Sequence, residues 1–319
     1  SPEITFVYGY AYPRWDNFGP LYAGLELRAL ERQVIGMKVK QNFAQKFSIG
    51  LSYAESTDRE STRVSSTDQV YQNRQYTVDA EYRPIKGLTF RSELSASLTR
   101  ENPSEGSDSI DYAGNAYKFE AIGEGGPSKV TLEYERVSPL FLTLLGSATQ
   151  DREKVKAKWR YMMTKKAIMN LGFLWYRDDL HGNKPNGRTD NYKPDLGFTL
   201  LQLFNRENLA LDLTYSMNRQ YGNRQSAVDH ILNMNYKDRF GFLESETNLG
   251  YSIYDTRTAV RNEEEFIYNT SLGSRHTYNK MVFKPALYLG GRTLQDELNS
   301  VTDKIYEYSL GLGFEIPEK

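Results

Sequence analysis

Residues 153–162 read EKVKAKWRYM, and the cations fall on every second position. An α-helix would spread this pattern around its circumference, because it turns once in about 3.6 residues. A β-strand places successive side chains on opposite faces, so the pattern predicts a strand with one apolar and one basic face. The basic face carries Lys154, Lys156, Lys158 and Arg160.

The same alternation recurs along all 319 residues, for example at 76–83, 88–99, 209–217 and 306–314. Between the strands, tight turns are predicted near Ala44, Ile85, Gly125, Lys165, Arg206, Arg239 and Tyr278, and longer connections at 58–73, 101–114, 138–150, 179–190, 221–225, 257–262 and 295–300. Each period of about 40 residues therefore holds two strands of about 10 to 14 residues, whereas a propeller blade of that length needs four short strands.

Fifteen strands are predicted from Val34 to Phe314, and the stretch 21–29 is a candidate sixteenth that also fits a short helix. The stretch 4–12 is strand-like as well. It is predicted to be an additional strand, an extension of another pairing or an interior arm. The predicted organisation is an N-terminal arm or extra strand at 1–20, one β domain at 21–315 and a tail at 316–319, with about 16 strands and a range of 14 to 18.

Composition limits the function classes. Lys plus Arg total 40 and Asp plus Glu total 41, and this near-neutral balance argues against a general nucleic-acid binder. The chain has no cysteine, which excludes disulfides, thiolate metal sites and haem attachment through Cys. No apolar run approaches the length of about 18–20 residues that a membrane helix needs. No cofactor and no metal site are predicted.

Two architectures could use strands with one apolar face. A soluble sandwich would hide the apolar faces in one core, but its strands average about five or six residues. The predicted strands are about twice as long, and aromatic residues such as Phe47, Tyr82, Phe90 and Trp159 gather near their ends. Long strands with aromatic ends are typical of a sheet that crosses a membrane. A soluble all-β protein remains the alternative.

The last predicted strand, YEYSLGLGF at 306–314, combines alternating aromatics with a terminal Phe. With the long meander, it resembles the porin-like bacterial outer-membrane β-barrel class over nearly the whole chain. The chain departs from that pattern by continuing with EIPEK after Phe314. The resemblance implies a transmembrane antiparallel up-and-down β-barrel with short periplasmic turns and longer extracellular loops. It also implies lipid and lipopolysaccharide as surroundings and allows a homo-oligomer.

In such a barrel the basic face of 154–160 would line the lumen, because each cation facing lipid costs up to ~2–4 kcal/mol near the midplane. Glu133 and Glu135, on the preceding strand, are predicted to share that lumen. The basic residues then either form cross-strand ion pairs or attract anionic solutes. Glu244 and Glu246 are the candidate acidic counterparts on another wall.

The connection 136–150, RVSPLFLTLLGSATQ, is apolar where other long connections are polar. It has three interpretations: an extension of two strands, a constriction or plug folded into the lumen, or a surface for a partner. The candidate gate residues are Leu140, Phe141, Leu142, Leu144 and Leu145.

The sequence therefore predicts an outer-membrane pore or conduit with a charged lumen. The alternative is a scaffold barrel whose lumen is filled by a partner protein, a polymer or an electron carrier. A third interpretation rests on DDLH at 178–181 and DH at 229–230, which are similar to short stretches of omptin-type outer-membrane proteases. Such two-residue matches are weak, so no catalytic residue is assigned.

Overall fold

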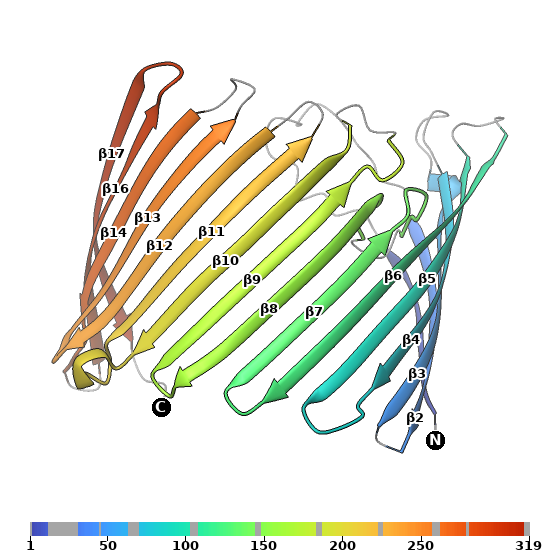
Figure 1. Ribbon diagram of the computed structural model, residues 1–319, viewed down its shortest axis with the longest axis horizontal. Helices are drawn as coiled ribbons and strands as arrows, with labels where there is room; N and C mark the ends of the chain where they lie inside the picture. The colour runs from blue at the N-terminus through green and yellow to red at the C-terminus, as the bar shows by residue number, and fades with distance from the viewer. Residues whose placement is uncertain are drawn as a thin grey trace. The chain divides into compact units, whose positions relative to one another are not determined.

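The computed structural model describes residues 2–11, 31–44, 46–62, 70–102, 108–143, 148–182, 187–222, 226–256, 262–278 and 281–315. Seventeen strands within these ranges form one sheet (Figure 1). Their helical elements are two single 3-10 turns, η2 (Glu60–Thr62) and η3 (Leu203–Asn205). No helix in these ranges has the length and apolar character that crossing a membrane requires.

The chain divides into two compact units. Unit 1 comprises Ser1–Gly123, Leu132–Lys154 and Asp178–Gly182. Its strands are β1 (Glu3–Ala11), β2 (Arg32–Phe43), β3 (Phe47–Asp58), β4 (Val70–Tyr82), β5 (Leu88–Asn102), most of β6 (Ile110–Gly125) and of β7 (Ser128–Val137), and the start of β8 (Arg152–Thr164).

Unit 2 holds the remainder of the chain. Its strands are most of β8, followed by β9 (Ala167–Asp178), β10 (Thr189–Leu201), β11 (Ala210–Gly222), β12 (Ser226–Phe240), β13 (Leu243–Thr256), β14 (Asn262–Ser274), β15 (His276–Tyr278), β16 (Met281–Asp296) and β17 (Val301–Glu315).

Successive long strands pair antiparallel, as the alternating connections predict. All fifteen strands predicted from Val34 to Phe314 are present, and the three-residue β15 is added in the connection before β16. The sixteenth long strand of the described ranges is β1, which pairs with β2 from Glu3↔Lys40 to Ala11↔Arg32. Of the three interpretations of the stretch 4–12, the structure has the additional strand. The stretches 21–29 and 316–319 lie outside the described residues.

Short connections fall where the sequence predicts them. The β2–β3 connection contains Ala44 at φ 48°, and the β6–β7 connection contains Gly126 at φ 53°. This left-handed region is free of strain for glycine and costs other residues energy, which explains the glycine at 126. A similar glycine, Gly241 at φ 61°, lies between β12 and β13.

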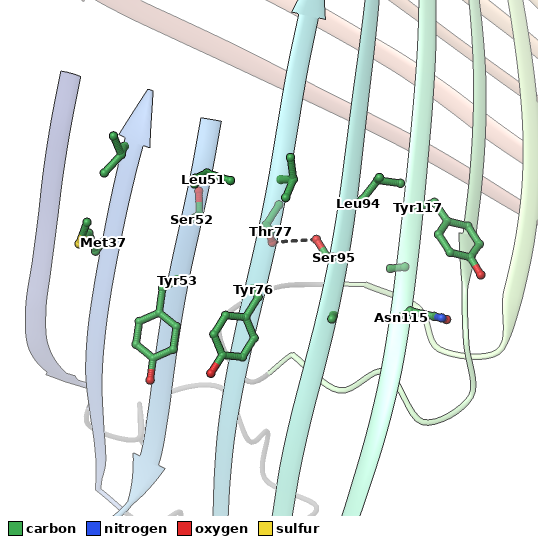
Figure 2. Close-up of a pocket in the computed structure, with 14 residues that line it drawn as sticks. Met37, Leu51, Ser52, Tyr53, Tyr76, Thr77, Leu94, Ser95, Asn115 and Tyr117 are labelled. Atoms are coloured by element: carbon green, nitrogen blue, oxygen red, sulfur yellow. Dashed lines mark hydrogen bonds between the residues drawn. The ribbon is translucent and has the colours of Figure 1, made fainter. Parts of the chain in front are cut away.

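The two faces of the unit 1 sheet have an unusual distribution of exposure. Figure 2 shows Met37, Leu51, Tyr53, Tyr76 and Leu94 projecting from one face of β2–β5, and these five side chains line an apolar groove of about 680 Å³. Leu94 is 47% exposed, whereas Ser97 and Thr99 on the opposite face of the same strand are 0% and 2% exposed. The apolar face is therefore open, and the polar face of β5 is covered between residues 95 and 99.

Aromatic and charged residues bound the apolar face of unit 1. At the turn end, the rings of Phe43 and Phe47 lie 5.8 Å apart. Towards the loop end, the rings of Tyr53 and Tyr76 lie 5.2 Å apart. On each strand a charged residue lies two positions from the tyrosine in the direction of the loop. On β5 the apolar stretch from Phe90 to Leu98 is about 27 Å long at about 3.4 Å per residue. An apolar band between aromatic rows is typical of a barrel wall that faces lipid.

Unit 2 repeats the alternation. On β11 the residues Leu211, Leu213 and Tyr215 share one face, and Asp212 and Thr214 share the other. Across the described residues of both units, the buried apolar side chains are only Val70, Val137, Phe141 and Leu209, while twelve polar or charged residues are buried.

The β1–β2 register can be tested with a disulfide, because the chain has no cysteine of its own. Phe6 lies directly opposite Met37, so Phe6→Cys combined with Met37→Cys is expected to crosslink under mild oxidation. The control pair, Val7→Cys with Met37→Cys, places the thiols on opposite faces and is expected to stay reduced. Gel mobility without reductant reports the crosslink. Equal crosslinking of both pairs would contradict the register.

Candidate functional site: an inward segment on the polar face of unit 1

The segment 138–143 lies on the polar face of β4–β6 and does not extend β7. The strand β7 ends at Val137 and β8 begins at Arg152. The backbone N–H of Leu142 donates to the hydroxyl of Ser97 (3.2 Å), and its carbonyl accepts from the side-chain amide of Asn73 (2.8 Å). Thr143 donates to the side chain of Gln75 (3.2 Å). In the described residues the segment therefore contacts the polar face and does not continue β7 as a strand.

Phe141 anchors this segment. Its side chain is 2% exposed, and its backbone lies against Gly114 of β6. A Cβ at position 114 would lie 2.2 Å from the Phe141 nitrogen, so only glycine leaves room for this approach. The backbone of Asn115 exchanges two hydrogen bonds with Ser138, one with its N–H and one with its hydroxyl (both 2.9 Å). The segment is thus fixed at both of its ends.

A second group of contacts fixes the return of the chain into β8. Asp151 is buried, has φ 56°, and accepts a hydrogen bond from the backbone N–H of Leu180 (3.0 Å). Its backbone carbonyl accepts from the N–H of Asp179 (3.0 Å). Arg152 binds both carboxylate oxygens of Asp178, at 2.6 and 3.1 Å. The connections after β7 and after β9 therefore support each other within unit 1.

Ion pairs cover the polar face beneath the segment. Lys154 bonds Glu133 at 2.9 Å and Glu135 at 2.7 Å. Further along the same face, Arg91 pairs with Glu81 (2.8 Å) and Glu120 (3.0 Å). A polar cavity of about 610 Å³ lies between the segment and this wall, and its lining includes Gln75, Glu93, Lys118, Glu135, Phe141 and Lys154. The cavity has both signs of charge on its walls.

The other predicted site residues have separate environments. Lys156, Lys158 and Arg160 occupy the same alternate positions of β8 as Lys154, and none of them takes part in an ion pair among the described residues. Glu246 pairs with Lys237 (3.0 Å) and Glu244 with Arg239 (3.6 Å), so each predicted acidic counterpart has a cation on the neighbouring strand. Leu140 is exposed, Leu142 is half-buried, and Leu144 and Leu145 lie outside the described residues.

The residues of the protease interpretation are divided between the units, with 178–181 in unit 1 and 229–230 in unit 2. Asp229 and His230 are consecutive on β12, so their side chains point to opposite faces. The Nδ1 of His230 lies 2.9 Å from the hydroxyl of Tyr215 on the apolar face, while Asp229 accepts from Asn218 (3.0 Å). In the described ranges no group of three or more His, Asp or Glu residues is placed to hold a metal ion.

Sequence reasoning missed the residues that hold the segment, namely Asn73, Gln75, Ser97, Gly114 and Asp151. Of these residues, Gly114 could have been singled out from the sequence, because a glycine inside a strand pattern often marks a close approach of another backbone. The others look like ordinary polar positions of alternating strands.

No protein-family model and no curated protein matches the chain by sequence. Among solved structures, the chain is similar to the siderophore receptor PirA from Acinetobacter baumannii, with 9% identity and a TM-score of 0.48 over 89% of this chain and 57% of that chain. The outer membrane transporter YddB from Escherichia coli has 10% identity and a TM-score of 0.41 over 90% of this chain and 61% of that chain. OccK3 (OpdO) from Pseudomonas aeruginosa has 10% identity and a TM-score of 0.42 over 98% of this chain and 94% of that chain.

The chain thus spans 57% and 61% of the first two of these proteins. At such low identities and TM-scores, the function proposed below rests on the residues of the chain itself.

The contact between Gly114 and Phe141 gives a direct test of the inward segment. In a Thr143→Cys background, Gly114→Val is expected to displace the segment and to raise the maleimide reactivity of the new thiol at least five-fold. The matched control is Gly123→Val, because nothing lies within 4 Å of a Cβ at position 123. If both valine variants leave the labelling rate unchanged, the segment does not rest on β6.

Proposed function

We propose that the chain is a bacterial outer-membrane β-barrel that passes solutes along its polar face, with the segment 138–143 narrowing the passage. The observation that carries the proposal is the combination of an open apolar face with a charged polar face that the segment 138–143 covers in part. In water, exposing so many large apolar side chains would be unfavourable by about 25 cal/mol per Å². Against lipid chains the same face is compatible with its surroundings.

Backbone chemistry supports a closed arrangement. A sheet that crosses a membrane must satisfy every backbone N–H and C=O internally, and only closure into a barrel does so for strands. Single-chain bacterial barrels have even strand numbers, and the described ranges hold sixteen long strands if the three-residue β15 is set aside. Lipid and lipopolysaccharide would then surround the apolar face.

The polar face suits passage of a hydrated solute. Around Lys154 and Arg91 its carboxylates and cations are partnered across strands, so this part of the wall is charged and well ordered. The segment 138–143 is held on this face by a small number of hydrogen bonds and one buried ring. Such a segment reduces the cross-section while leaving the cavity of about 610 Å³ beside it.

Conductance tests the pore. The purified chain in planar lipid bilayers is expected to give stable single-channel steps with a preference for anions, because Lys156, Lys158 and Arg160 add positive charge to the polar face. A folded chain that gives no steps would contradict the open pore and would favour the alternative of a barrel filled by a partner.

The same recordings test the basic positions. Lys156→Gln combined with Lys158→Gln is expected to lower the anion-to-cation permeability ratio at least two-fold, because two positive charges leave the passage. The control is Lys165→Gln with Lys166→Gln, which removes the same charge from the β8–β9 turn. Equal shifts of the reversal potential in both variants would show that the positions on β8 have no special access to the passing ions.

The lipid-facing side is tested by stability. Leu94→Arg is expected to destabilise the chain folded in lipid vesicles by ~2–4 kcal/mol, because the cation would lie in the apolar band. Leu94→Phe, which keeps the position apolar, is expected to have little effect. Urea titration followed by Trp fluorescence measures both. If the arginine is tolerated as well as the phenylalanine, this face does not contact lipid.

A further inference from the structure

Unit 2 carries a row of side-chain amides across the middle of four strands. Residues directly opposite each other in antiparallel strands share a face. The registers place Asp212 opposite Asn235, Asn235 opposite Asn248, and Asn248 opposite Asn269. In the adjacent row, Asn233 lies opposite both Thr214 and Gly250. We refer to Asp212, Asn233, Asn235, Asn248 and Asn269 as the amide belt.

The amide belt lies on the polar face of unit 2. Its members alternate along their strands with apolar residues such as Leu213, Met234 and Leu249. These three also lie opposite one another in register, so they form the other face. In the arrangement proposed above, the amide belt is therefore in contact with the passing solute.

Much of the hydrogen-bonding capacity of the amide belt is unused within the described part of the chain. The side chains of Asn233 and Asn248 make no hydrogen bond to a described residue, and the Oδ1 atom of Asn235 is buried without a partner there. Asn235 and Asn269 each make one hydrogen bond within the described ranges. Asn235 donates to Glu246 at 3.5 Å, and Asn269 accepts from Tyr288 at 2.7 Å. An amide has two donors and two acceptor lone pairs, so the side chains of Asn233 and Asn248 keep theirs for a solute.

Glycines on the same face accommodate two amides of the belt. A Cβ on Gly250 would lie 3.2 Å from the Oδ1 of Asn233. A Cβ on Gly290, which lies opposite Asn269, would lie 2.7 Å from the Oδ1 of that residue. Because these positions lack side chains, the amides of Asn233 and Asn269 can lie close against the neighbouring backbone.

Two ion pairs flank the amide belt along the strands. On the turn side, Lys237 and Glu246 form an ion pair of 3.0 Å. On the loop side, Glu265 pairs with Arg292 and also accepts from Ser252 (3.4 Å). The amides therefore lie between the Asp212 carboxylate at one end of the row and Glu307, opposite Gly290, at the other. A molecule rich in hydroxyls matches this chemistry, because its hydroxyls can donate to the carboxylates and amide oxygens and accept from the amide N–H groups.

We propose that the amide belt is a transient binding site for neutral saccharides on their way along the polar face. The inference rests on the proposed pore function and specifies its substrate class. Hydroxyls of successive sugar rings would exchange their water partners for amide groups spaced by about 5 Å across the strands. Because the groups of the belt other than Asp212 are neutral amides, binding stays weak enough for release.

The test uses the purified full chain in planar bilayers, with maltohexaose added on one side. The sugar is expected to interrupt the current for longer than polyethylene glycol of the same mass. Asn233→Leu combined with Asn248→Leu keeps the number and branching of the side-chain heavy atoms and is expected to shorten the interruptions at least ten-fold. The control is Thr247→Val, which is the neighbour of Asn248 on β13 but lies on the opposite face, where it bonds Thr270 (3.3 Å).

The outcomes separate the two proposals. A folded chain without any conductance overturns the pore, and the sugar inference falls with it. A conducting chain whose current is interrupted equally by maltohexaose and by the glycol overturns the sugar inference alone. Interruptions that are as long in the leucine variant as in the wild type do the same. If the double variant fails to fold, which heat-modifiability on a gel reports, Asn248→Leu alone replaces it with an expected three-fold shortening.

Discussion

The whole structure depends on the placement of its apolar side chains on the open face of the sheet. In a soluble β protein, burial of apolar area supplies most of the favourable free energy. Here Leu94 and its neighbours are open to the surroundings, while Ser97 and Thr99 are covered. The sheet is therefore stable only if the medium around it is apolar. Strand length, aromatic ends and ion-paired polar face all follow from that requirement.

The polar face meets a different requirement, which is to satisfy its own groups without an apolar core. Cross-strand ion pairs do so around Lys154 and Arg91. The segment 138–143 does so by presenting its backbone groups to Ser97 and Asn73. An isolated buried polar group would cost about 1–3 kcal/mol, so these partners explain why a loop with several apolar residues can rest on hydroxyl-bearing strands.

The sequence was sufficient to predict the period, the turns and the faces, because a strand repeats every two residues and one side had to be apolar throughout. The pairing of Lys154 with Glu133 and Glu135 could also be predicted, because these residues lie on consecutive strands. The contact of Asn73 with Leu142 was not, because it joins residues 69 positions apart. The amide belt needs the registers of four strands at once, and a slip of one residue would move every amide to the other face. Alternation alone does not decide whether 4–12 or 21–29 forms the sixteenth strand, because both stretches are strand-like.

The way in which the segment 138–143 is held has a consequence for time-dependent behaviour. Its hydrogen bonds to Ser97, Asn73 and Gln75 can each be replaced by water, and a bond of this kind contributes only about 0.5–1.5 kcal/mol net. Phe141 adds one buried ring. Detachment therefore involves a barrier of modest height and no disruption of the sheet, and motions of such loops occur within about nanoseconds to microseconds. A passage narrowed in this way would have a fluctuating width, and its open-state current would carry excess noise even at constant voltage.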